Sequence, residues 1–289
     1  MPTCAFLTTD TLDAFVAYDH LAVAPLARLG WTVEMVPWRA EADWEAYDVV
    51  VVRSPWDYQD DPDAFLDVLG AIDTSAARLE NPLAVMRWNL RKTYLRDLEA
   101  AGVPIVPTRW AEGLTSDALA AAFDAWGTAE VVAKPVVSAN ADGTFRLGPD
   151  AETWNAAVSA LADRACMIQP FVPSVVAEGE WSVFAFGGAV SHAILKTPAA
   201  GDFRVQEEHG GVIRGVEPGA DLLALTGAAL AAVPHPDPLL YARVDAVRLT
   251  DGTLSIIELE LIEPSLYFPF ADGSAERFAA ALDEQGPGV

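Results

Sequence analysis

Two apolar runs near the C-terminus, residues 239–249 (LLYARVDAVRL) and 253–262 (TLSIIELELI), flank the dipeptide Asp251-Gly252. Asp-Gly between alternating apolar runs is a strong signal for a β-hairpin closed by a two-residue type I′ turn. The first run carries Arg243 and Asp245, and the second carries Glu258 and Glu260, at alternate positions among mostly apolar residues. The sequence therefore predicts two paired antiparallel strands with charged side chains on one face.

A two-residue turn fixes which side chains of this hairpin meet. Asp245 then faces Glu258, and Arg243 faces Glu260. Residues two apart in a strand share a face, so all four side chains converge on one side. Three carboxylates on apolar strands are costly unless positive charge neutralises them, and oxygen ligands at this density suit Mg²⁺. The alternative is a salt-bridged, solvent-facing strand pair, and a three-residue loop would shift the register by one.

The composition is that of a globular protein. The chain has 289 residues, of which 52% are hydrophobic and 21% charged, so the disordered class is excluded. A formal net charge of −24 argues against nucleic acid and anionic membranes as partners. No apolar run approaches the roughly 18 to 20 residues of a membrane-spanning helix, and the first residues do not resemble a secretory signal. With Cys4 and Cys166 in apolar surroundings, we expect reduced thiols and a cytoplasmic protein.

The N-terminal part of the chain alternates strand and helix patterns. This rhythm predicts an open, doubly wound parallel sheet, which binds ligands at the carboxyl ends of its strands. Those ends carry Thr8-Thr9-Asp10 and the segment Arg53-Ser-Pro-Trp-Asp-Tyr58. The expected elements are strands at 3–9, 31–36 and 47–53 and a helix at 17–29.

Beyond Asn81-Pro82 the pattern changes to alanine-rich helices and further strands. We expect helices at 87–101, 115–126, 150–163, 219–232 and 273–283. We expect strands at 129–135, 166–169, 180–187, 189–197, 240–249 and 253–262.

The segment Glu258-Leu-Glu260-Leu-Ile-Glu-Pro264, preceded by Arg243-Val-Asp245, resembles the metal-binding end of the ATP-grasp superfamily of ligases. The bacterial glutathione synthetase-like branch is the most similar, and the resemblance covers about residues 81 to 270. It implies an α/β protein with an N-terminal substrate-side domain (1–82), an ATP-grasp small lobe (83–166) and a large lobe (167–289).

The resemblance also implies roles for the hairpin side chains. Asp245, Glu258 and Glu260 would hold two Mg²⁺ ions, or Mn²⁺, that bridge the phosphates of ATP. Glu260 stands where glutathione synthetases often have asparagine, and a carboxylate still serves a metal there. Arg243 would stabilise charge on an acyl phosphate or tetrahedral intermediate.

The chain has only three lysines, and each lies where the family places a cation. Lys134 ends an apolar strand, where an unpaired ammonium is expensive, and the resemblance implies a contact with the α-phosphate and adenine. Lys92 matches an earlier nucleotide lysine, a role that Arg91 could take instead. Lys196 and Arg204 match cations that face phosphate or substrate. The alternatives are a solvated helix lysine for Lys92 and a rim charge for Lys196.

Two further segments match nucleotide-binding parts of the family. Ser138, Gly143 and Thr144 lie in the segment that corresponds to the phosphate-covering loop of the family. This segment has one glycine, whereas many members of the family have more. The resemblance implies that a linker between the lobes reads the adenine edge and that Glu180 bonds the ribose hydroxyls. The linker residues are Gln169, Pro170, Phe171 and Val172. A strand exit and a surface glutamate are the alternatives for these two sites.

The segment 53–58 also resembles, more loosely, the ligase that closes the D-cycloserine ring from an O-ureido-serine precursor. Arg53, Ser54 and Asp57 are the candidates for holding a charged, amino-acid-like substrate. The alternative is a loop whose Trp56 packs at the domain interface.

The function that the sequence predicts is an ATP- and Mg²⁺-dependent ligase. It would activate a small carboxylate as an acyl phosphate and couple it to an amine-type nucleophile, with a homodimer as the default assembly. A catalytically silent or regulatory nucleotide-binding protein on the same fold is the second hypothesis. An oxidoreductase is a third, although no Gly-x-Gly-x-x-Gly follows the first strand.

Overall fold

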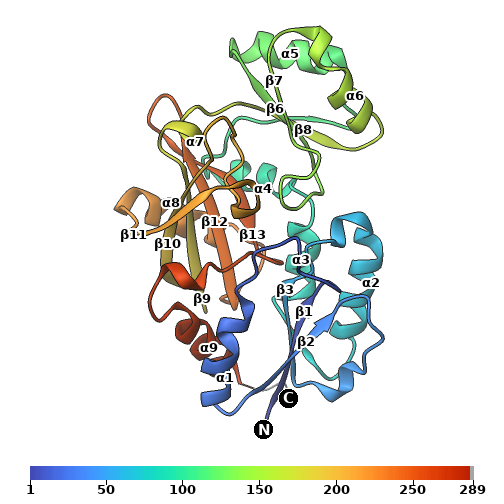
Figure 1. The fold of residues 1–289 in the computed structure, drawn as a ribbon, viewed down its shortest axis with the longest axis vertical. Coiled ribbons are helices and arrows are strands. Elements are labelled where there is room, and N and C mark those ends of the chain that lie inside the picture. The colour runs from blue at the N-terminus through green and yellow to red at the C-terminus, as the bar shows by residue number, and fades with distance from the viewer. Residues whose placement is uncertain (287–289) are drawn as a thin grey trace.

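The computed structural model describes residues 1–286 and contains three β-sheets. In Figure 1 the small sheet lies at the top, the N-terminal sheet at the lower right, and the five-stranded large sheet along the left. Helices and strands are mixed throughout, which confirms the α/β class. Among residues 1–286, no helix is both long and apolar enough to cross a membrane.

The N-terminal sheet is parallel, with the order β2-β1-β3-β4. Its strands are β1 (Thr3–Thr8), β2 (Thr32–Pro37), β3 (Val49–Ser54) and β4 (Arg78–Glu80). Every residue of β3 is buried, as expected of a strand covered on both faces. The predicted parallel sheet is confirmed, with β4 as an additional strand at its edge.

The helices around this sheet differ more from expectation. The helix predicted at 17–29 is a 3₁₀ turn, η1 (Asp19–Ala22), that continues into the short α1 (Val23–Arg28). Helix α2 (Pro62–Asp73) was not predicted, although Asp61 caps it by accepting from the Ala64 N–H and Pro62 opens it. Two 3₁₀ turns, η2 (Trp44–Ala46) and η3 (Tyr58–Asp60), complete this part.

The small sheet is antiparallel in its pairings, with the order β5-β8-β6-β7. Its elements are β5 (Arg109–Ala111), α5 (Ser116–Trp126), β6 (Val131–Pro135), β7 (Phe145–Leu147), η4 (Ala151–Thr153), α6 (Asn155–Leu161) and β8 (Cys166–Pro170). The helix predicted at 115–126 is present as α5, which begins at the Thr115 cap and ends at Gly127, whose φ of 57° is left-handed. The boundary predicted between 166 and 167 falls inside β8, which pairs with β5 and β6 in this sheet.

The large sheet has the order β11-β10-β9-β12-β13. Its elements are α7 (Ser174–Ala177), β9 (Glu180–Phe186), β10 (Ala189–Thr197), η5 (Glu207–His209), β11 (Val212–Val216), α8 (Ala220–Ala231), β12 (Tyr241–Arg248), β13 (Leu254–Glu260), η6 (Phe268–Phe270) and α9 (Ser274–Gln285). Helix α8 packs Leu222 and Ala229 into the core on one face of this sheet. The other face is shared: Phe184 and Tyr241 pack in a core with the N-terminal sheet and α9, whereas Arg243 lies farther along the same face.

The helix predicted at 87–101 is broken into α3 (Leu83–Asn89) and α4 (Tyr94–Ala100). These helices belong with the large sheet rather than the small lobe, because Asn89 and Tyr94 bond the backbone of edge strand β13. Asn89 Nδ2 donates to Leu259 O (2.8 Å) and its Oδ1 accepts from Leu261 N (2.9 Å), while Tyr94 Oη accepts from Leu259 N (2.9 Å). The edge of β13 is thereby covered, which removes an exposed template for pairing with other chains.

The hairpin β12–β13 has the predicted pairing near Asp245 and Glu258, but its loop is longer than predicted and β13 contains a bulge. Its loop has three residues, Thr250 to Gly252, because Leu249 N bonds Thr253 O (2.8 Å), so the predicted two-residue turn is wrong. The register near the loop is accordingly shifted by one, with Ala246 opposite Ile256. A β-bulge at Ile257 then restores the register, and Asp245 lies opposite Glu258 and Arg243 opposite Glu260.

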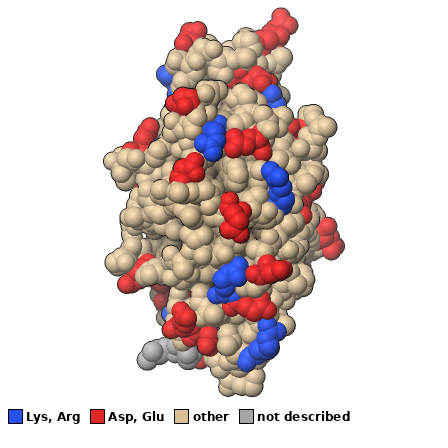
Figure 2. All heavy atoms as spheres, turned by 90° about the vertical axis from the view of Figure 1, so that its left-hand side faces the viewer, with Lys and Arg blue, Asp and Glu red and all other residues tan. Residues whose placement is uncertain are grey.

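The surface is acidic in character. On the face shown in Figure 2, the described basic side chains stand apart from one another and beside acidic ones. Among the exposed ion pairs of the structure is that of Arg28 with Glu276, at 2.9 Å. This face carries no continuous positive area among residues 1–286, in keeping with the net charge of −24.

His192 is a buried polar residue in the core beneath the large sheet. Its ring stacks on Phe184 with centroids 4.2 Å apart, and Nε2 lies 3.1 Å from Leu266 O. Burial lowers the pKa of His192 to about 4, and the nearby Arg277 adds to the effect. The folded protein therefore holds a neutral imidazole at neutral pH.

The pH dependence of stability should reveal this histidine. The folded-state pKa lies below the unfolded value of about 6.5, so the stabilisation is present above pH 6.5 and is lost as the pH falls toward 4. Between pH 7.5 and pH 5 we expect wild type to lose about 2 kcal/mol more unfolding free energy than His192→Gln, measured by urea denaturation. An equal loss in both proteins would show that His192 does not titrate in this way.

Candidate functional site

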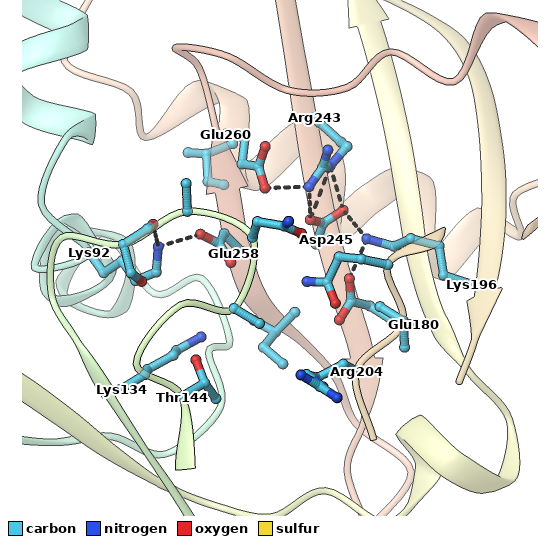
Figure 3. Close-up of a pocket in the computed structure, with 18 of the residues that line it drawn as sticks. Lys92, Lys134, Thr144, Glu180, Lys196, Arg204, Arg243, Asp245, Glu258 and Glu260 are labelled. Carbon is cyan, nitrogen blue, oxygen red and sulfur yellow. Dashed lines mark hydrogen bonds and ion pairs between the residues drawn. The ribbon is translucent and has the colours of Figure 1, made fainter. Parts of the chain in front are cut away.

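A cavity of about 210 Å³ is lined by residues of the small and large sheets, together with residues outside the strands of the N-terminal sheet. Nearly all predicted nucleotide, metal and catalytic side chains line it, and Figure 3 shows the charged ends of Lys196, Arg243 and Asp245 directed toward one another. These lining residues are Lys92, Lys134, Ser138, Thr144, Gln169, Pro170, Phe171, Val172, Glu180, Lys196, Arg204, Arg243, Asp245, Glu258 and Glu260. The fold thus gathers residues that are more than 160 positions apart in the sequence.

Asp245 is at the centre of the charged group. Arg243 Nη2 donates to its Oδ2 at 2.9 Å, Lys196 Nζ lies 3.5 Å from Oδ1, and the Ser182 hydroxyl also donates to Oδ1. Burial alone would raise the pKa of Asp245, but Arg243 and Lys196 outweigh it and hold the pKa below its ordinary value. Asp245 is therefore a buried carboxylate that stays ionised.

The two glutamates of β13 differ from each other. Glu258 accepts from Lys92 Nζ at 2.6 Å, and Lys92 with Lys134 lowers its pKa against the effect of burial. Glu260 pairs with Arg243, yet burial and the neighbouring Glu258 and Asp245 raise its pKa to about 8. The face therefore carries more acid than its cations neutralise, which is the condition under which a divalent cation binds favourably.

Lys196 joins two of the predicted sites. Its ammonium pairs with Glu180 as well as with Asp245, and its side chain is only 4% exposed. The backbone next to Glu180 is fixed by Gly179, whose φ is +120° and where a Cβ would come within 2.8 Å of Lys196 O. A glycine is required there so that the start of β9 can approach β10 this closely.

Lys134 differs from the other two lysines. It is buried, and its ammonium forms no ion pair with a carboxylate of residues 1–286. Burial lowers its pKa, and Glu258 only partly offsets that effect. Figure 3 shows its side chain pointing into the cavity beside Thr144. An anionic ligand in the cavity would relieve the cost of burying this charge.

The three predicted metal ligands share a face but do not form a ready cage. Within residues 1–286, no group of three or more His, Cys, Asp or Glu side chains is arranged to hold a metal ion as it stands. Lys92 and Arg243 explain this, because they hold the carboxylates of Glu258 and Glu260. The donor set fits Mg²⁺ in chemistry, since all its ligand atoms are carboxylate oxygens.

The predicted phosphate loop borders the cavity through other residues than its glycine. Ser138 and Thr144 line the cavity, and Lys92 Nζ donates to Ser138 O at 2.9 Å. Gly143 does not line it; its φ of +63° serves the turn, and its Cα faces Pro135. Asn140 and Ala141 do line it, with left-handed φ values of 48° and 58° that non-glycine residues rarely adopt.

The linker between the small and large sheets forms the apolar end of the cavity. Gln169 Nε2 donates to Thr108 Oγ1 at 3.0 Å, and this hydrogen bond restricts the rotation of the Gln169 side chain. Phe171 lies under the guanidinium of Arg146, 3.8 Å from its ring centroid, and Phe203 from the large-sheet side packs edge-on against it. Arg204, next to Phe203, pairs with Asp202 at 2.7 Å and remains partly exposed.

The predicted substrate residues of the N-terminal sheet do not line the cavity. Arg53 is fully buried and bonds Asp19 (3.0 Å) and Pro264 O (2.7 Å). Ser54 bonds Thr8, and Asp57 is held by Trp38 and Arg39. A direct substrate contact is therefore not supported for these three, because their polar groups are already satisfied within the protein.

Their neighbours reach the cavity instead. Trp56 and Tyr58 line it, as do Glu263, Ser265 and Tyr267 from the segment after β13. The sequence offered a signal for the first two, since they lie in the segment 53–58. For Glu263, Ser265 and Tyr267, the only signal in the sequence was their position directly after the predicted metal ligands.

Comparison with known proteins gives the relatives of this chain. Residues 4–81 match a family model described as the N-terminal domain of D-cycloserine synthetase DcsG. The chain is 35% identical over 297 residues to the cycloserine biosynthesis protein DcsG of Streptomyces lavendulae, covering 96% of this chain and 97% of that protein.

Solved structures agree with this relationship. The crystal structure of D-cycloserine synthetase DcsG matches with a TM-score of 0.87 and 31% identity, covering 98% of this chain and 99% of that one. D-alanine–D-alanine ligase of Bacillus anthracis matches with a TM-score of 0.71 over 98% and 95% of the two chains. Its identity is 16%, so this second likeness shows the fold alone.

Replacing Lys134 separates binding from stability. In Lys134→Met the buried ammonium is removed, so we expect an unchanged or higher unfolding free energy but an ATP Kd raised at least about tenfold, because a charged contact is lost. Isothermal calorimetry and urea denaturation measure the two effects. Arg28→Met, at an exposed ion pair far from the cavity, is the control. Unchanged ATP affinity in Lys134→Met would remove Lys134 from the nucleotide site.

Proposed function

Because this chain belongs to the family of the cycloserine biosynthesis protein DcsG, within the ATP-grasp ligases, we propose that it is a D-cycloserine synthetase. The protein is an ATP-dependent ligase that joins a carboxylate to an amine-type nitrogen of small-molecule substrates, with the help of a divalent metal. The proposal adds that both groups belong to one molecule, O-ureido-serine. Its ureido nitrogen displaces phosphate from the acyl phosphate to close the ring, and water then removes the carbamoyl group as carbon dioxide and ammonia. The observation that carries it is the identity of 35% over nearly the whole of both chains.

The roles of the cavity residues follow from their chemistry and form part of the proposal. Lys134 and Lys92 bind phosphate oxygens, and the linker 169–172 and Glu180 hold adenine and ribose. Arg243, in contact with Asp245 and Glu260, faces the carboxylate to be activated. Its fixed positive charge stabilises the oxyanion that develops when the nitrogen attacks the acyl phosphate. Lys196 and Arg204 border the same space.

The metal is proposed to be a pair of Mg²⁺ ions, replaceable by Mn²⁺, held by Asp245, Glu258 and Glu260. When bound, these ions neutralise phosphate charge and orient the transferred group. Binding requires that Lys92 and Arg243 release Glu258 and Glu260, which leaves both cations available for phosphate or substrate oxygens. The protein thus exchanges internal ion pairs for ligand contacts of the same charge.

The remaining features stay predictions. They are the division into domains, a cytoplasmic location, a homodimer, and the finer likeness to the glutathione synthetase-like branch. A silent nucleotide-binding role finds no support, because the acidic set of β12 and β13 is intact and the relatives are ligases. An oxidoreductase is set aside for the same reason.

The reaction can be tested directly. Purified protein with ATP, Mg²⁺ and O-ureido-D-serine should release ADP, and mass spectrometry should find D-cycloserine. Hydroxylamine in a parallel sample should trap the acyl phosphate as a hydroxamate. ADP release that needs a second amine, with a linear product, would contradict ring closure while leaving the ligase class intact.

Glu258→Gln tests the metal-binding face. The change keeps the size of the side chain but removes a carboxylate from the shared face, so ADP formation should fall at least about 100-fold with the fold retained. Glu276→Gln, which alters only the exposed pair with Arg28, should keep wild-type activity. Full turnover by Glu258→Gln would rule out Glu258 as a metal ligand.

A further inference from the structure

Glu263 is a cavity-lining acid for which the reaction described above has no use. It is largely buried, and its carboxylate forms no ion pair with a cation of residues 1–286. The other acids of the charged group all have partners: Glu180 has Lys196, Asp245 has Arg243 and Lys196, Glu258 has Lys92, and Glu260 has Arg243. A buried carboxylate without a cation is costly, so its retention at a ligand cavity points to a positively charged ligand.

The backbone that carries Glu263 is fixed from the N-terminal sheet. Trp56 Nε1 donates to Glu263 O at 2.8 Å, and Arg53 Nη2 donates to Pro264 O at 2.7 Å. Tyr241 Oη donates to Ile262 O at 2.8 Å. Three consecutive carbonyls are thus held by three buried or nearly buried side chains. The carboxylate is presented from a rigid support, as a binding site requires.

The surroundings of Glu263 suit an ammonium group. Of residues 1–82, only Phe15, Val16, Trp56 and Tyr58 line the cavity, and none of them is charged. The rings of Phe15 and Trp56 pack edge to face with centroids 5.4 Å apart. Gln206 also lines the cavity, and its buried Oε1 has no hydrogen-bond partner within residues 1–286. The cavity therefore offers acceptors and aromatic surface, the two features that favour a cation.

A positive group lies on the other side of the same segment. Arg243 Nη1 donates to Ser265 O at 3.3 Å, so its guanidinium is anchored two residues beyond Glu263. A fixed cation and a fixed anion beside one short segment match a ligand that carries a carboxylate and an ammonium close together. The Tyr58 hydroxyl is the hydrogen-bond partner of the Glu263 carboxylate. A simple carboxylic acid would leave Glu263 with this neutral partner and no cation.

We propose that Glu263 is a specificity-determining residue that binds the α-ammonium of the substrate, so that the enzyme accepts α-amino acids and rejects carboxylic acids without that group. The inference rests on the proposed function, because it takes Arg243 as the residue that faces the substrate carboxylate. Gln206 Oε1 is a further acceptor among the residues that line the cavity. Arg53 and Trp56 act as positioning residues through the carbonyls that they hold.

The test compares two substrates in two proteins. The substrates are O-ureido-D-serine and ureido-oxypropanoate, its counterpart without the α-amino group; the proteins are wild type and Glu263→Gln. Wild type should prefer the amino substrate by on the order of 100-fold in kcat/KM, and the variant by less than about 5-fold, because a buried charged contact is lost. The loss should appear mainly in KM. Equal preferences in the two proteins would overturn the proposal.

Controls separate recognition from folding and from the nucleotide site. Glu263→Gln should keep the wild-type Tm and ATP Kd; a raised ATP Kd would place Glu263 at the nucleotide or metal and overturn its role with the ammonium. Glu217→Gln, at an exposed acid outside the cavity, should retain the wild-type preference.

Calorimetry keeps this proposal distinct from the proposed function. O-ureido-D-serine and ureido-oxypropanoate are each titrated into wild type and Glu263→Gln in the presence of a non-hydrolysable ATP analogue. If wild type forms no ADP yet binds the amino ligand, and Glu263→Gln does not, the ammonium site is supported and the synthetase proposal fails. If wild type binds both ligands equally well, the ammonium site is excluded whatever the turnover.

Discussion

The register of β12 against β13 is the constraint on which the site depends. Asp245 and Glu258 lie opposite each other only because the bulge at Ile257 compensates for a three-residue loop. A side chain in a strand points to one face or the other, so a slip of one residue would place Glu258 on the apolar face. The carboxylates, the lysines that oppose them and the segment carrying Glu263 all take their positions from this pairing.

The charged side chains of the cavity form ion pairs with one another, and most of these pairs join two different elements. Lys92 lies in the break between α3 and α4, Lys196 at the end of β10, and Arg243 on β12. Each pairs with a carboxylate on another part of the large sheet or on its own strand. Because the pairs are buried, breaking one without replacing it is expensive. A ligand that carries both phosphate and metal can replace both members of a pair at once.

The sequence predicted those features that local patterns encode. The parallel N-terminal sheet, the hairpin strands and the caps of α5 follow from burial, alternation and cap residues. A need for an anion near Lys134 was also foreseeable, because a lysine in an apolar strand is costly without one. Lys92 and Lys196 were placed at the site only through the resemblance to the ATP-grasp ligases. The break before Tyr94 was not, since the hydrogen bonds from Asn89 and Tyr94 to β13 that fix it join residues about 170 apart. Arg53 was misjudged for the same reason: its partners, Asp19 and Pro264, are distant in the sequence.

The pinning of residues 262–264 has a consequence for protein engineering. The N-terminal sheet contributes no charged side chain to the cavity lining, yet Trp56 and Arg53 hold the carbonyls of Glu263 and Pro264. A chimera that receives residues 1–82 from a relative with another substrate must therefore keep Trp56 and Arg53 as hydrogen-bond donors. Without them, the segment 262–264 would lose the contacts that hold Glu263 in position. Substrate selectivity in this enzyme therefore depends on the contacts between residues 1–82 and the segment 262–264, and exchanging either part alone would not transfer it.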